Sequence, residues 1–165
     1  MVLTHIAAYS LFYAVVVNVY LFLMMVTTSP RVWGYADYPD AVKAKVPPQT
    51  KSEKRTALII GLPWMLFTFG FPVYSTYVLK ANLGGEIPFW IAFLNVFVMV
   101  TLVTLGDLII LDWLIISKIT PQFVIIPGTE EVDYKDFSHH YRAHARAAPI
   151  LFLLCLLLAG IVWYI

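Results

Sequence analysis

The stretch PFWIAFLNVFVMVTLVTLGDLIILDWLIISK, residues 88–118, decides what kind of fold this chain adopts. It is apolar over most of its length and has two acids, Asp107 and Asp112, towards its far end. As a helix, residues 89–117 would extend about 43 Å, whereas the hydrocarbon core of a bilayer is about 30 Å thick. The segment must therefore tilt or leave the hydrocarbon at one end. The acids mark that end, because an ionised carboxylate in hydrocarbon is costly.

The two acids of this stretch are expected to point in different directions. We expect Asp112 at the membrane interface, and Asp107, about 7.5 Å deeper along the helix axis, facing protein or trapped water and not lipid. At about 100° per residue, the two side chains would be roughly 140° apart around an α-helix. The spacing therefore predicts that they do not form one acid pair and that each has its own partner.

Composition indicates a membrane protein for the chain as a whole. Of its 165 residues, 61% are hydrophobic and 13% are charged. Soluble domains average about 45–50% apolar and about 25% charged residues. The net charge of +1 argues against a nucleic-acid partner, since there is no long basic run. The single cysteine, Cys155, excludes an internal disulfide or a CxxC redox pair, and its apolar neighbours indicate a packing role.

Four apolar segments are long enough to cross a bilayer, which predicts an all-α, polytopic membrane protein with one transmembrane domain over residues 1–165. The first segment lacks a basic start and a good cleavage site, so we expect a retained helix and not a signal peptide. Pro63 and Pro72 predict a kink in the second segment. The short turn at 80–87 predicts that the second and third spans are antiparallel neighbours in a four-helix bundle. The predicted spans are residues 6–27, 57–79, 89–117 and 149–165.

The basic residues predict the orientation of these spans. Loop 28–56 has six Lys and Arg residues and loop 118–148 has four, against one in the turn between the second and third spans. The positive-inside rule then places both long loops in the cytoplasm. Both termini are expected outside, with the protein in the plasma (inner) membrane.

The end of the second long loop predicts an amphipathic interfacial helix that leads into the last span. An apolar and aromatic stripe recurs there at helical spacing, formed by Tyr134, Phe137, Tyr141 and Ala145. A neighbouring stripe at i, i+4 and i+8 is formed by Asp136, His140 and His144. With the predicted orientation, this helix shares one membrane level with Asp107 and Asp112.

Three interpretations of these polar residues remain open. In the first, the two span aspartates form structural ion pairs with arginines that hold the helix ends together. In the second, the arginines bind an anionic group such as a lipid phosphate. The arginines in both cases are Arg55, Arg142 and Arg146.

The third interpretation is a divalent-metal site, with zinc as the example. It uses His140 and His144 together with Asp136 or a span aspartate, because His-xxx-His places both rings on one helix face. Two histidines alone are more commonly an exposed polar face. A haem is not expected, because none of the four histidines lies inside a predicted span, and there is no c-type haem, P-loop or GxSxG motif.

Two classes of function follow from these alternatives. One is a non-enzymatic subunit or small transporter in which the polar residues are structural or gate a pathway. The other is a membrane-embedded enzyme that acts on a lipid-like or anionic substrate at the inner leaflet, with Asp107 and Asp112 as its catalytic candidates. The expected partners are the lipid bilayer and a homo-oligomer or membrane complex, since four spans rarely enclose a pore alone.

Overall fold

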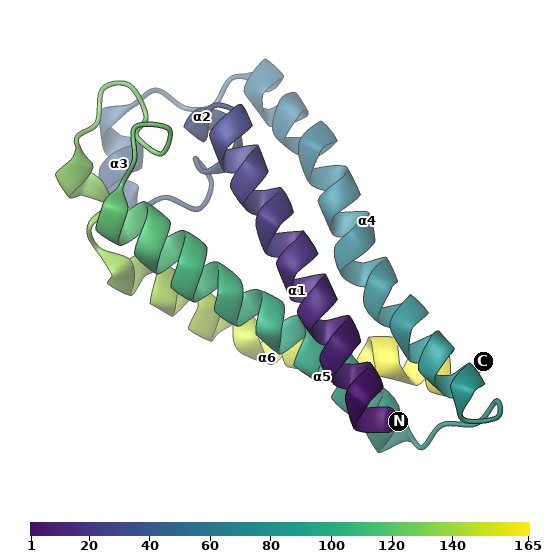
Figure 1. Ribbon diagram of the computed structural model, residues 1–165. Coiled ribbons are helices and arrows are strands. Elements are labelled where there is room, and N and C mark those ends of the chain that lie inside the picture. Colours follow the sequence, from purple (N-terminus) through teal and green to yellow (C-terminus); the bar gives the residue numbers. More distant parts are fainter.

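The chain is built of helices alone, as the computed structural model of residues 1–165 shows (Figure 1). The helical class predicted from the sequence is confirmed. In chain order the elements are α1 (Val2–Thr27), α2 (Pro30–Trp33), α3 (Asp40–Lys45), α4 (Lys51–Asn82), α5 (Phe89–Gly106), the π-helix η1 (Asp107–Ile119), the 3-10 helix η2 (Glu131–Tyr134) and α6 (Phe137–Tyr164).

Four stretches are long and apolar enough to cross a membrane, one for each of the four apolar segments of the sequence. They are α1, α4, α5 with its continuation η1, and the stretch Glu131–Tyr164 that contains α6. Their outer faces expose many large hydrophobic side chains. Such faces are stable in a bilayer, because lipid tails are as apolar as leucine.

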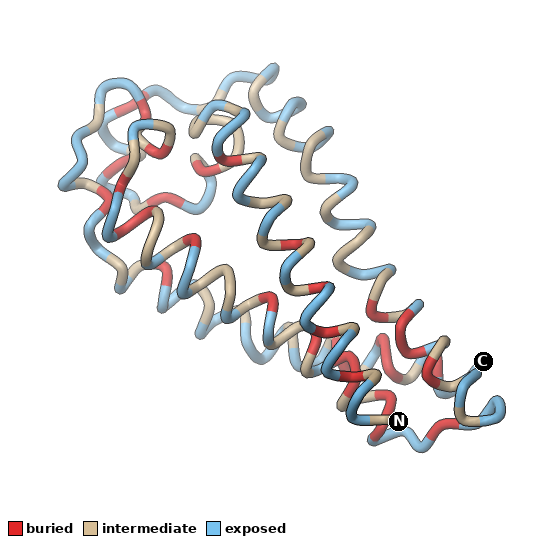
Figure 2. The backbone as a smooth tube through the Cα atoms, viewed as in Figure 1, coloured by how far each residue is buried: buried red, intermediate tan, exposed pale blue.

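The helix α5 contacts all three of the other long helices. Its buried residues recur every three or four positions, and four of them, Ala92, Asn95, Val96 and Met99, have no exposed surface. Figure 2 shows that buried positions gather where the helices meet near the two termini, and again among the loops at the opposite end. The protein therefore has its two larger packed regions at its two ends, with a smaller buried cluster between them along α1 and α5.

The helix α4 remains continuous despite its two internal prolines. It begins with a capping box in which Thr50 and Glu53 each accept a hydrogen bond from the other's backbone N–H. Pro72 cannot donate to the carbonyl of Thr68. The Tyr13 hydroxyl of α1 donates to that carbonyl instead, at 2.8 Å. A side chain of a neighbouring helix thus satisfies the group that the proline leaves free.

The two long connections pack on each other around an apolar centre, here called the loop cluster. Its buried members include Tyr38, Val42, Val124, Ile126 and Tyr134. The Tyr38 hydroxyl donates to the Val124 carbonyl at 2.9 Å, and the Tyr134 hydroxyl accepts from the Ile126 N–H at 2.9 Å. The first bond joins the two connections, and α3 and η2 are in contact at this end of the molecule, away from both termini (Figure 1).

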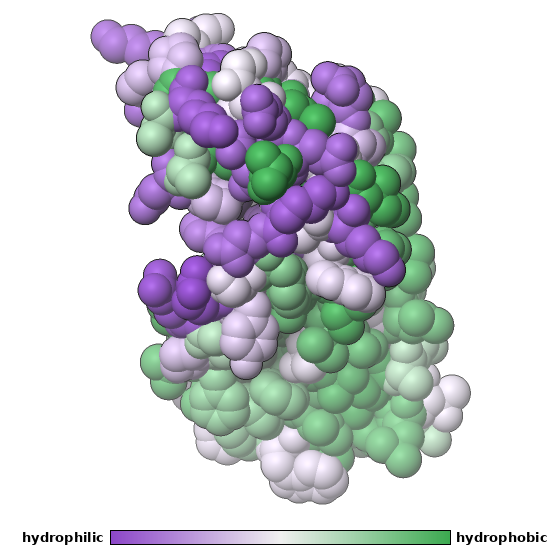
Figure 3. Space-filling model, turned by 90° about the vertical axis from the view of Figure 1, so that its left-hand side faces the viewer, coloured by the Kyte–Doolittle hydropathy of each residue, from purple (hydrophilic) through white to green (hydrophobic).

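Hydrophilic residues gather over this same end of the molecule, and the rest of the visible surface is mostly hydrophobic (Figure 3). The helix α6 connects the two zones. It runs without interruption from Phe137 to Tyr164, with Pro149 inside it. The polar residues that precede the last predicted span therefore belong to the same helix as that span, which aligns their side chains rigidly with the membrane-spanning part.

Candidate metal centre

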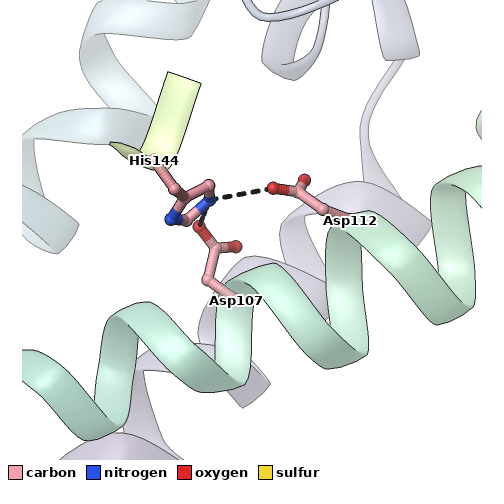
Figure 4. A group of neighbouring side chains, drawn as sticks. All are labelled: Asp107, Asp112 and His144. Atoms are coloured by element: carbon pink, nitrogen blue, oxygen red, sulfur yellow. Dashed lines mark hydrogen bonds and ion pairs between the residues drawn. The ribbon is translucent and has the colours of Figure 1, made fainter. Parts of the chain in front are cut away.

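The π-helix η1 brings Asp107 and Asp112 onto one face. In a π-helix each N–H bonds to the carbonyl five residues earlier, so the turn is wider than in an α-helix and residues five apart lie on the same side of the helix. The prediction that these two side chains are roughly 140° apart, made for α-helical geometry, is therefore wrong. Figure 4 shows both carboxylates directed towards His144 of α6.

The left-handed conformation of Thr120 ends this π-helix. Its φ of 50° departs from helical geometry, and its N–H closes the last turn on the Ile115 carbonyl at 2.8 Å, a spacing of five residues. Its hydroxyl also donates to the Ile116 carbonyl at 2.7 Å. The wide helical turn is therefore hydrogen-bonded up to its end, which holds the Asp107 to Asp112 spacing in place.

The partners of the two aspartates come from one face of α6. His140 Nδ1 lies 3.2 Å from Asp112 Oδ1, and His144 Nε2 lies 2.9 Å from Asp112 Oδ2. His144 Nε2 also lies 3.6 Å from Asp107 Oδ2. Asp112 is thus held between two imidazole rings, and His144 is shared between two carboxylates. These four residues are called the Asp–His cluster below.

The Asp–His cluster opens to the outside at Asp107. The side-chain exposure rises from 6% for His140 to 14% for Asp112, 18% for His144 and 33% for Asp107. No lysine or arginine forms an ion pair with either aspartate. The cluster is therefore a half-buried, negatively charged group of oxygens and imidazole nitrogens whenever its histidines are neutral.

Asp37 approaches the Asp–His cluster from the first long connection. His139 Nε2 lies 2.9 Å from the Asp37 carbonyl oxygen and links this segment to the start of α6. Asp37 lies at the protein surface, but partial desolvation by the surrounding protein and then the charge of Asp112 raise the pKa of its carboxyl group. Sequence reasoning missed this residue, because no spacing or motif connects it with residues about seventy positions away.

The geometry of the Asp–His cluster suits a divalent metal. Ligand atoms of Asp107, Asp112 and His144 all lie within 4.8 Å of one another. Ligands in a tetrahedral zinc site, at bonds of about 2.0–2.2 Å, are about 3.4 Å apart. The two distances from His144 Nε2, 2.9 Å and 3.6 Å, lie on either side of that value. His140 would then not bind the metal itself, and its imidazole would orient the Asp112 carboxylate.

The other predicted site residues lie elsewhere. Asp136 is the N-cap of α6, where its carboxylate accepts from the Ser138 N–H at 3.0 Å and lies 3.8 Å from Arg142 Nη2. Arg146 is exposed on α6, and Arg55 is exposed near the start of α4. Figure 1 shows the starts of α4 and α6 well apart. The structure thus unites Asp107, Asp112, His140 and His144, and it does not bring the three arginines together.

Comparison with protein-family models, with curated proteins and with solved structures found no match to this chain. The function must therefore be inferred from the chemistry of the site itself.

Proposed function

We propose that this protein is a multi-pass integral membrane protein that binds a divalent transition-metal ion at the Asp–His cluster. Asp107, Asp112 and His144 would be the ligands, and His140 would position Asp112. The observation that carries this proposal is the convergence of three ligand atoms, from two helices, within 4.8 Å of one another. Oxygen and imidazole donors without thiolate suit zinc and similar divalent metals better than copper(I).

The charge of the cluster supports a metal over a purely structural set of ion pairs. Two carboxylates on one helix face repel each other unless a cation or a proton lies between them. The predicted arginine partners are absent from the contacts of Asp107 and Asp112. The histidines are the only partners within reach that can carry a positive charge. A dication would compensate both carboxylates.

In a membrane, the simplest role for such a metal site is in a non-enzymatic subunit or small transporter. Such a protein would hold the metal at the membrane boundary, with the cluster on the cytoplasmic side of the plasma (inner) membrane and both termini outside. The start of α6 would lie in the interface as an amphipathic segment. The four long helices would form an antiparallel bundle, and a homo-oligomer would supply the remaining wall of any pathway.

A second candidate function is a metal-dependent enzyme that acts on a lipid-like substrate. A mostly apolar groove of about 210 Å³ lies between α5 and α6. Its lining includes Thr104 and Leu105, just before Asp107, and Ala148, one turn after His144. An acyl chain in this groove would bring its polar head to the Asp–His cluster. Hydrolysis of a lipid extract that requires both the metal and Asp107 would favour the enzyme over the subunit or transporter.

The test of metal binding compares variants inside and outside the cluster. Purified protein in mild detergent is titrated with zinc, and bound metal is measured by calorimetry and by elemental analysis after desalting. We expect one zinc per chain for the unmodified protein, and a loss of that site in Asp112→Asn and His144→Gln. Asp136→Asn and His139→Gln change the same residue types at the start of α6, outside the ligand set, and should keep full binding.

Two results would contradict the proposal. Absence of stoichiometric zinc, cobalt(II) and manganese(II) binding by the folded protein would show that the cluster is structural. Loss of binding in Asp136→Asn with retention in Asp112→Asn would move the site to the ligand set His140, His144 and Asp136 that the sequence spacing predicts.

A further inference from the structure

A second polar group lies at the other end of the long helices, near the chain termini. His5 Nε2 of α1 lies 3.1 Å from the Ser75 carbonyl oxygen and 3.2 Å from Ser75 Oγ. Asn95 Nδ2 of α5 donates to Ser75 Oγ at 3.2 Å and to Thr76 Oγ1 at 2.9 Å, both on α4. Ser75, Thr76 and Asn95 have no exposed surface. Three helices are thus joined by neutral polar side chains within their apolar packing.

Two oxygen atoms at this level have no hydrogen-bond partner among the protein's atoms. One is Asn95 Oδ1 and the other is Ser10 Oγ of α1, and both residues are fully buried. On the inward face of α1, Ser10 lies between Ile6, which packs in the apolar cluster of Val96, and Tyr13, which packs in that of Met99. Asn18 Nδ2 of α1 donates to the Val103 carbonyl of α5 at 3.3 Å, a separation of 85 positions. The same separation places Ser10 level with Asn95 in the neighbouring helix.

Buried polar atoms without a partner are rare, because they lose their hydrogen bonds to water and gain none in return. The cost is not reduced in a membrane, where the surrounding lipid offers no donor or acceptor. Exchanging the oxygen and nitrogen of the Asn95 amide does not remove the problem, since the other atom of the amide would then lack a partner. A bound ligand with hydrogen-bonding groups would supply the missing hydrogen-bond partner.

We propose that Ser10, Ser75 and Asn95 form a binding site for water inside the membrane domain. A buried water needs two to four polar partners. Asn95 Oδ1 accepts from it, and the hydroxyl of Ser10 both donates and accepts. His5 is the only one of these polar residues that reaches the surface, so it marks the route by which water enters.

This water site is separate from the Asp–His cluster. The buried apolar residues Tyr13, Val17, Met99 and Val103 lie between the two along α1 and α5. The helix pair therefore has a neutral hydrated site at one end and a charged site at the other, with mostly apolar packing and the polar Asn18 between them. The water site does not depend on metal binding, so its test is independent of the proposed function.

Two buried methionines provide a matched pair for the test. Met99 Sδ lies 3.8 Å from Asn95 Nδ2, and Met99 is fully buried. Met25 is 3% exposed and lies in the apolar loop cluster. Pulsed X-ray irradiation produces hydroxyl radicals from water at its own position, and these convert a neighbouring methionine to the sulfoxide. Mass spectrometry of the irradiated protein then reports which buried methionine has water beside it.

We expect Met99 to be oxidised several-fold faster than Met25 in the unmodified protein. Asn95→Leu should reduce the oxidation of Met99 to the level of Met25. Thr101→Val, a polar-to-apolar change on the same helix and away from the site, should leave Met99 oxidation unchanged. If Asn95→Leu does not yield monodisperse protein, Ser10→Ala removes one partner of the water with less disturbance and should lower Met99 oxidation as well.

Two outcomes overturn the proposal. One is equal, slow oxidation of Met99 and Met25 in the unmodified protein, which shows that the site is dry. The other is rapid oxidation of Met99 that persists in folded Asn95→Leu or Ser10→Ala protein, which shows that the water is held by other groups.

Discussion

The two ends of the helical domain both place a histidine beside polar side chains of another helix, but with different chemistry. The end near the termini uses neutral groups, and its members Ser75, Thr76 and Asn95 are fully buried. The loop end uses carboxylates, and its members Asp107 and Asp112 remain partly exposed.

The difference follows from the cost of charge in a membrane. Neutral side chains that hydrogen-bond across helices are tolerated within the apolar packing. Ionised side chains are costly there and are retained at a boundary, next to water or a counter-charge. The loop cluster and the polar surface at one end of the molecule supply such a boundary for the Asp–His cluster. The charged site therefore depends on the loops, whereas the neutral site depends on the helices alone.

The largest expected effect tests this dependence on the loops. Tyr38→Ala removes a fully buried aromatic ring and its hydrogen bond to the Val124 carbonyl. We expect a loss of stability of about 3–5 kcal/mol, the range for large aromatic truncations in a core. Chemical denaturation in detergent, followed by tryptophan fluorescence, measures it. Tyr141→Ala, at an exposed tyrosine of α6, should change stability little. Equal effects of the two variants would refute a packed loop cluster.

The next effect tests the π-helical spacing of the two aspartates. The double variant Asp107→Ile with Ile109→Asp moves one carboxylate by two positions. In an α-helix residues 109 and 112, which are three apart, share a face, whereas in the wider turn of a π-helix they point to different sides. We expect zinc affinity to fall by about 100-fold or more, beyond the effect of losing an outer partner. Zinc calorimetry measures it, and unchanged or tighter binding would show that the segment is α-helical.

A smaller effect on zinc affinity is expected from His140, which contacts the ligand Asp112 but is not itself a ligand. His140→Gln should weaken zinc binding by about 10–100-fold, because Asp112 loses the ring that orients it while the ligand set remains. His139→Gln is the neighbouring control and should have no such effect. Affinity should also fall as the pH is lowered in the unmodified protein, since protonated imidazole cannot bind metal. Identical zinc affinity in His140→Gln and the unmodified protein would remove His140 from its positioning role.

The smallest effect concerns Asp37. Because its pKa is raised in the folded protein, the folded state holds this proton more tightly than the unfolded state does. This proton therefore contributes to the stability of the folded state below the ordinary Asp pKa of about 3.9, and the contribution is lost as the pH rises through the raised pKa. Asp37→Asn removes this loss and should stabilise the protein at neutral pH by no more than about 0.5 kcal/mol. Thermal melts at acidic and neutral pH measure the difference, and destabilisation at neutral pH would show that the charged form of Asp37 is favourable.

Sequence reasoning reached the residues of the charged site but not their arrangement. The i, i+4 spacing placed His140 and His144 on one face, and intramembrane position singled out Asp107 and Asp112. Regular α-helical geometry then separated the two aspartates, and the i, i+4, i+8 spacing with His140 and His144 favoured Asp136 as the third ligand. Both inferences depend on assumed local geometry. The sequence pattern did not single out Asn95, because a hydrogen-bond partner on another helix leaves no trace in spacing.

The sequence by itself determined that the chain is all-helical, with four stretches apolar and long enough to cross a membrane. These properties follow from length and hydrophobicity along each segment, which are local. Only the tertiary structure decided that Asp107 and Asp112 share a face, that two imidazoles from α6 meet them, and that Asp37 comes close to them. Those outcomes depend on the turn width of η1 and on the packing of segments far apart in the chain, and neither is encoded in the pattern of any one segment.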